Sequence, residues 1–150
     1  LGNIESLRDW GHARDYAEMM WLMLQQNKPE DFVIATGKQI SVREFINMCA
    51  NELGWGGSAK RQPIIWEGEG INEIGKRADT LEIVIRIDPR YFRPAEVNSL
   101  LGDASLAREK LGWQPKTSLE QLVKEMISLD KAAASSEAHL RKEGLFKSNF

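Results

Sequence analysis

Two short stretches of this chain combine residue types that can bind a charged ligand, and the first spans residues 8–16. It reads Arg-Asp-Trp-Gly-His-Ala-Arg-Asp-Tyr. An arginine just ahead of a helix can set its planar, permanently charged guanidinium against a diphosphate, which makes Arg8 a candidate binding residue. The alternative for Arg8 is an ordinary surface arginine. His12 is more simply a packed or solvated histidine than a base, and Asp9 and Asp15 are interpreted as acidic residues at a helix start.

The second stretch, residues 88–97, reads Asp-Pro-Arg-Tyr-Phe-Arg-Pro-Ala-Glu-Val. It brings cations, aromatic rings and a carboxylate together between a predicted strand and a predicted helix. Such a loop can hold a nucleotide, with an arginine on phosphate, Tyr91 against a flat group and Glu96 accepting from ribose hydroxyls or a base edge. The alternative is a rigid surface loop stiffened by Pro89 and Pro94.

The sequence contains no motif that would carry catalysis by itself. No G-x-G-x-x-G follows a predicted strand, and neither a P-loop nor a G-x-S-x-G is present. Tyr16 and Tyr91 both lack a lysine four residues later, so the Tyr-x-x-x-Lys pair of nicotinamide-dependent dehydrogenases is absent. Two histidines and one cysteine give no zinc spacing. We therefore predict no catalytic, cofactor-binding or metal-binding residue within this chain.

Composition excludes two classes of partner. Lys plus Arg number 20 against 22 Asp plus Glu, for a net charge of −2, so no basic field for nucleic acid is expected. No apolar run approaches the roughly 20 residues that cross a bilayer, so no membrane partner is expected. The single cysteine, Cys49, cannot form an internal disulfide, which indicates a reducing compartment and predicts a cytoplasmic protein.

Apolar residues that recur at steps of three and four predict the helices that would position these stretches. The first covers 16–24 and is closed by Lys28–Pro29. Capping-box spacings open a helix over 41–53 and another from Ser118 through Leu129. A shorter helix is expected over 103–111, with Asp103 as its cap.

Three runs predict strands. The continuous apolar run 32–35 is typical of a strand buried on both faces. Residues 63–66 and 81–87 are expected to form a hairpin joined by the long charged segment 67–80, and 81–87 alternates apolar with charged residues. These elements make an α/β or α+β chain with too few strands for a doubly wound sheet, so neighbours for 32–35 are expected upstream of Leu1.

In this order the two stretches resemble a specific group of proteins. Residues 8–10, and the stretch 102–115 with its Leu-Gly-Trp-Gln-Pro ending, are similar to motifs of extended short-chain dehydrogenases that act on nucleotide sugars, although Leu106 stands where lysine is usual. The strings 8–16, 31–37 and 88–97 resemble the GDP-mannose 4,6-dehydratase family more closely than its relatives.

The resemblance covers roughly residues 1–132 and is weakest over 54–79. It implies an α/β fold, the C-terminal part of an extended Rossmann-type short-chain dehydrogenase. Most of the chain would be the smaller substrate-binding domain, with 32–35 as an edge strand of the Rossmann sheet. Residues 1–134 would form this substrate-binding portion, and 135–150, which turn small and polar, are expected to be a frayed helix or a loosely ordered tail.

The resemblance also implies roles for four residues. Arg8 and Arg93 would contact the diphosphate of the nucleotide from opposite loops. Glu96 would bind the guanosine ribose, and Tyr91 would lie nearby.

As a whole enzyme, the family removes water from GDP-mannose in an NADP-linked reaction that makes GDP-4-keto-6-deoxymannose for deoxyhexose biosynthesis. The resemblance implies that NADP and the catalytic residues belong to a missing N-terminal Rossmann half, and that the complete protein is a homo-oligomer. These residues alone would then be inactive. The alternatives are an epimerase or reductase of the same superfamily and a non-catalytic remnant that binds a nucleotide sugar.

Overall fold

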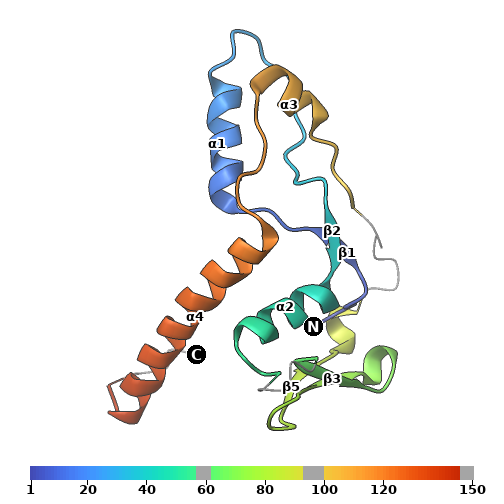
Figure 1. Cartoon of the computed structure of the whole chain (residues 1–150), viewed down its shortest axis with the longest axis vertical. Coiled ribbons are helices and arrows are strands. Elements are labelled where there is room, and N and C mark those ends of the chain that lie inside the picture. The colour runs from blue at the N-terminus through green and yellow to red at the C-terminus, as the bar shows by residue number, and fades with distance from the viewer. Residues whose placement is uncertain (57–61, 93–99, 146–150) are drawn as a thin grey trace.

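The computed structural model describes residues 1–56, 62–92 and 100–145 (Figure 1). Its elements in chain order, with η for a 3-10 helix, are β1 (Leu7–Asp9), α1 (Ala13–Leu24), β2 (Gln39–Ser41), α2 (Val42–Glu52), β3 (Ile64–Glu67), η2 (Gly70–Asn72), β4 (Ile74–Arg77), β5 (Ile83–Arg86), η3 (Pro89–Tyr91), α3 (Ser105–Leu111) and α4 (Leu119–Lys142). In Figure 1, α1 and α3 lie at one end of the molecule, α2 and the larger sheet lie at the other, and β1 and β2 connect them.

The strands form two separate antiparallel sheets. β1 pairs with β2, with Arg8 opposite Ile40, and the larger sheet has the order β3–β4–β5. The expected hairpin between 63–66 and 81–87 is therefore wrong, because β3 and β5 both pair with β4 instead of with each other.

The middle strand β4 was missed because its sequence, Ile-Gly-Lys-Arg, does not alternate. A strand hydrogen-bonded on both edges is held by its neighbours and needs little apolar signal of its own. Gly75 sits in a tight space, since an added Cβ would lie 3.0 Å from Ile64 and 3.1 Å from Trp66 and would press on both side chains.

The predicted strand 32–35 is also not observed. Among the described residues no strand pairs with it, and its backbone is irregular. Phe32 and Ile34 still turn inward against the first core, while Val33 is exposed. A strand exists only through its ladder partners, so an apolar run alone cannot form one.

Two small cores hold the molecule. The first packs Met19 of α1 against Ala107 of α3 and the ring of Trp113. The second packs Ala50 of α2 against Ile64 and Ile85 of the larger sheet. Of the apolar stripe predicted for α1, Tyr16, Met19 and Met23 pack in the first core, whereas Met20 and Leu24 are exposed. On α2 the second core uses Ile46 and Ala50 rather than the predicted stripe.

The helix boundaries follow local signals closely. Both capping boxes are present, at Ser41 for α2 and Ser118 for α4. α1 ends at Leu24, before Lys28–Pro29, and Asp103 lies one residue ahead of the N-cap of α3, where its carboxylate accepts from the Ser105 amide at 2.9 Å. For the segment after residue 134, α4 continues without interruption to Lys142.

Candidate functional site

β1 carries the first candidate binding residue. Arg8 lies in the middle of this strand and is half-buried, and its Nη1 donates to the carbonyl oxygen of Leu7 at 2.8 Å. The sequence suggested a position just ahead of a helix; Arg8 lies on a strand, and residues 10–12 lead from the end of that strand into α1. A strand fixes the direction of a side chain more firmly than a loop does.

Asp9, the neighbour of Arg8, clamps the turn that leads into β2. Its carboxylate accepts from the Thr36 amide at 3.0 Å, the Thr36 hydroxyl at 2.7 Å and the Gly37 amide at 2.8 Å. The Tyr16 hydroxyl approaches the same carboxylate at 3.5 Å. The interpretation of Asp9 as a helix-start residue is therefore wrong.

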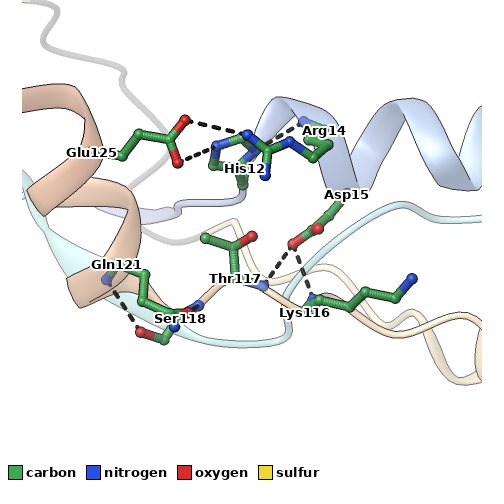
Figure 2. Close-up of polar contacts among 8 residues, drawn as sticks. All are labelled: His12, Arg14, Asp15, Lys116, Thr117, Ser118, Gln121 and Glu125. Carbon is green, nitrogen blue, oxygen red and sulfur yellow. Dashed lines mark hydrogen bonds and ion pairs between the residues drawn. The ribbon is translucent and has the colours of Figure 1, made fainter. Parts of the chain in front are cut away.

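His12 is the N-cap of α1. Its Nδ1 accepts from the Arg14 amide at 2.9 Å, and its Nε2 lies 3.4 Å from a carboxylate oxygen of Glu125 on α4 (Figure 2). Because Nδ1 accepts, Nε2 carries the proton in the neutral ring, on the side that faces Glu125. The residue serves the fold as a packed histidine.

Asp15 joins α1 to the start of α4. Its side chain is 3% exposed and accepts from the amides of Lys116 at 3.0 Å and Thr117 at 2.8 Å (Figure 2). Burial alone would raise the pKa of Asp15, but the hydrogen bonds from Thr117 and Lys116, with the nearby His12, outweigh it and hold this pKa below its usual value. Asp15 does lie in the first turn of α1, as expected.

The described start of the second stretch, residues 88–92, is held by its own aspartate. The Asp88 carboxylate accepts from the Arg90 amide at 3.0 Å and from its guanidinium at 2.6 Å. These hydrogen bonds from Arg90 lower the pKa of Asp88 to about 2. The Arg90 guanidinium also lies 5.7 Å from the centre of the Tyr91 ring, so this arginine is already engaged within its own loop.

Tyr91 is open to solvent, with 62% of the residue exposed. The segment that leads into β1 runs against the base of its loop, since the Asp88 amide donates to the Leu1 carbonyl at 2.8 Å and the Leu1 nitrogen donates to the Arg86 carbonyl at 3.1 Å. Gly2 sits so close that an added Cβ would lie 2.3 Å from the Tyr91 carbonyl oxygen. The backbone of residues 1 and 2, ahead of the first stretch, thus contacts the start of the second stretch.

The other two candidate residues, Arg93 and Glu96, lie outside the described residues. Arg8 and Tyr91 are both described, and no hydrogen bond or ring contact joins their side chains. The Asp9–Thr36 clamp was missed, although both residues lie in strings that carry the family resemblance. A contact between them was not apparent, because nothing local to either string shows that they meet.

A hollow of about 380 Å³ opens beside the ring of Trp10. Its wall includes Thr36, Lys38, Lys116 and Glu120, near the start of α4. The Trp10 ring itself stacks on Phe45 with centroids 4.0 Å apart. The lining does not include Arg8 or Tyr91, so this hollow is separate from the expected nucleotide surface.

The described part of the chain does not fit a dinucleotide cofactor. A Gly-x-Gly pair, Gly68 and Gly70, does follow β3, but it leads into the three-residue η2 and then an antiparallel strand. A dinucleotide needs a helix N-terminus after a parallel strand. Within these same residues no cluster of three metal-ligating side chains occurs, and no helix is long and apolar enough to cross a membrane.

Solved structures share this fold. The UDP-glucose 4-epimerase of Thermotoga maritima, solved with UDP-glucose, matches with a TM-score of 0.62 at 22% identity, over 89% of this chain and 34% of that chain. The Bordetella bronchiseptica enzyme WbmF, in complex with NADH, matches with a TM-score of 0.59 at 19% identity, over 97% of this chain and 36% of that chain. The chain thus shares the α/β fold of part of these two proteins, as the sequence predicted.

Sequence comparison identifies the family to which the chain belongs. The model of the family described as GDP-mannose 4,6 dehydratase matches residues 1–126, and the chain belongs to that family. It is 51% identical to the GDP-mannose 4,6-dehydratase of Yersinia enterocolitica, over 96% of this chain and 40% of the relative. It is 46% identical to the human GDP-mannose 4,6 dehydratase, over 87% of this chain and 33% of the relative. The chain therefore spans two-fifths or less of the length of these curated relatives.

Proposed function

We propose that this chain supplies the surface that holds the GDP moiety of GDP-mannose in a GDP-mannose 4,6-dehydratase. The family match over residues 1–126 carries the proposal. In it, Arg8 and Arg93 bind the diphosphate, Glu96 binds the guanosine ribose, and Tyr91 lies beside the nucleotide. Two features support these roles: Arg8 lies half-buried in the middle of β1, and Tyr91 is exposed.

The whole enzyme would make GDP-4-keto-6-deoxymannose, in the cytoplasm and as a homo-oligomer, for the synthesis of GDP-fucose or another deoxyhexose. Its NADP would be held by an N-terminal Rossmann half, since the described residues do not fit the cofactor. In this proposal the chain binds and orients the nucleotide, and the 150 residues alone do not turn over substrate.

A second candidate is a nucleotide-sugar-binding module that does no chemistry. These 150 residues carry no Tyr-x-x-x-Lys pair of their own, an absence that such a module shares with a part of any dehydratase, epimerase or reductase.

Isothermal titration calorimetry of the chain with GDP, UDP and dTDP tests the proposal. We expect GDP to bind more tightly than the two pyrimidine nucleotides. Equal affinity for all three nucleotides would reject a site specific for guanosine, and only a general nucleotide-sugar site of the superfamily would remain. Turnover of GDP-mannose after addition of a Rossmann half from a relative would separate the enzyme from the non-catalytic module.

A further inference from the structure

We propose that Asp9 is the positioning residue for Arg8: by clamping the Thr36–Gly37 turn, it fixes the face of β1 from which Arg8 meets its ligand. The inference deepens the proposed function and rests on it only for the identity of that ligand. Asp9 itself is not expected to contact the nucleotide.

The clamp concentrates several donors on one carboxylate. Two amides and one hydroxyl, from Thr36 and Gly37, donate to Asp9 at 2.7–3.0 Å. An ionised carboxylate offers only acceptors, and bonds to it are about twice as strong as bonds between neutral groups. An asparagine of the same shape would turn an NH2 group toward N–H donors, so the charge and the acceptors are both needed.

The fourth donor comes from α1 and requires a glycine. The Tyr16 hydroxyl approaches Asp9 at 3.5 Å across the backbone of Gly11. A Cβ added at Gly11 would lie 2.1 Å from that hydroxyl, so only glycine lets the tyrosine reach across. Asp9 therefore joins the end of β1, the turn before β2 and the first turns of α1.

The geometry of a strand transmits this clamp to Arg8. Successive side chains on a strand point to opposite faces, so fixing Asp9 toward the turn fixes Arg8 toward the other face. β1 is only three residues long and pairs with one partner, with Asp9 opposite Gln39 at the end of the ladder. A ladder this short frays readily, and the clamp closes the end next to Arg8.

Nuclear magnetic resonance of the 150-residue chain tests the inference without a ligand. The variants are Asp9→Asn, Thr36→Val, which removes the hydroxyl donor, and Thr36→Ser, which keeps it. The readouts are amide exchange at Gly37 and the order parameter of the Arg8 Nε–H group. Asp79→Asn removes a carboxylate from the turn between β4 and β5, in the other part of the molecule, and serves as the control.

For Asp9→Asn we expect Gly37 exchange to rise about 10- to 100-fold, the scale of a lost bond to a charged group, and the Arg8 order parameter to fall. Thr36→Val should move both readouts the same way, while Thr36→Ser and Asp79→Asn should match the native chain. The serine rescue and the Arg8 signal separate positioning from a general loss of structure. If Asp9→Asn fails to fold, the comparison of Thr36→Val with Thr36→Ser tests the inference in its place.

Faster exchange at Gly37 with an unchanged Arg8 order parameter would overturn the inference. GDP titration of the same samples keeps the two proposals apart. If the native chain does not bind GDP but Asp9→Asn still lowers the Arg8 order parameter, the proposed function is rejected and the positioning role of Asp9 stands.

Discussion

At the scale of single residues, the string around Arg8 divides into one candidate for the ligand and several residues for the fold. Asp9 holds a turn, His12 caps α1, and Asp15 receives the start of α4. Similarity across a family does not separate these roles, because a clamp and a ligand contact both constrain the residue type. The hydrogen bonds of Asp9, His12 and Asp15 show that these three residues serve the fold.

In the complete enzyme, Arg8→Ala is expected to weaken GDP-mannose binding by about 1.5–3 kcal/mol, the scale of a hydrogen bond to a charged group. NADP binding should stay nearly unchanged. Calorimetry with both ligands measures this, and Arg141→Ala on the far part of α4 is the matched control. Equal losses for NADP and GDP-mannose would show that Arg8 does not contact the sugar nucleotide.

Leu81 is the one non-glycine residue with a positive φ, 62°, among those the structure describes. This left-handed conformation costs a leucine about 1–2 kcal/mol, and glycine recovers it while adding about 0.5–1 kcal/mol of chain entropy to the unfolded state. Leu81→Gly should therefore stabilise the chain by up to about 1 kcal/mol in urea unfolding. The residue is 63% exposed, so little burial is lost. Leu81→Ala is the comparison and should bring no gain.

At the scale of elements, the junction of α1 and α4 makes stability depend on pH. The folded pKa of Asp15 is held below its usual value of 3.8, so its contribution is complete well above that value and is lost as the pH falls through the folded pKa. Urea unfolding from pH 7 down to pH 3 should show this loss in the native chain and a flatter profile in Asp15→Asn. At pH 7 the variant should be about 1–3 kcal/mol less stable. Asp130→Asn on α4 should stay within about 0.5 kcal/mol of the native chain at pH 7, and an equal drop there would contradict the junction argument.

The elements also show what local sequence can predict. Capping boxes and apolar stripes predicted α2 and α4, because a helix forms its own backbone hydrogen bonds and a capping box marks its start within four residues. β4 and the pairing of β3 with β4 were not predicted, because strand pairing depends on residues that are distant in the sequence. For the same reason the exposed Tyr91 could be named as a candidate from its residue type, whereas the Asp9–Thr36 contact could not.

At the scale of the whole molecule, the outer side of α1 is apolar and open. Trp21 is 59% exposed, and Met20 and Leu24 beside it are exposed as well. Such a face promotes association when nothing covers it. Trp21→Glu should therefore reduce self-association, measured by light scattering of the eluting protein, without lowering the free energy of unfolding. Leu129→Glu, at 64% exposure on α4, is the control. An equal effect from that control would assign the association to general hydrophobicity.

The length of α4 gives its anchored end a mechanical consequence. Its 24 residues at about 1.5 Å each make a rod about 36 Å long, which extends away from α1 in Figure 1. A tilt of about 10° at Ser118 would carry Lys142 through about 6 Å. The hydrogen bonds that Asp15 accepts from Lys116 and Thr117 thus lie at the end of α4 about which such a tilt would turn. With one spin label near the tip of α4 and one on β3, a change in the distance between the labels would report whether the buried Asp15 carboxylate still holds the start of α4.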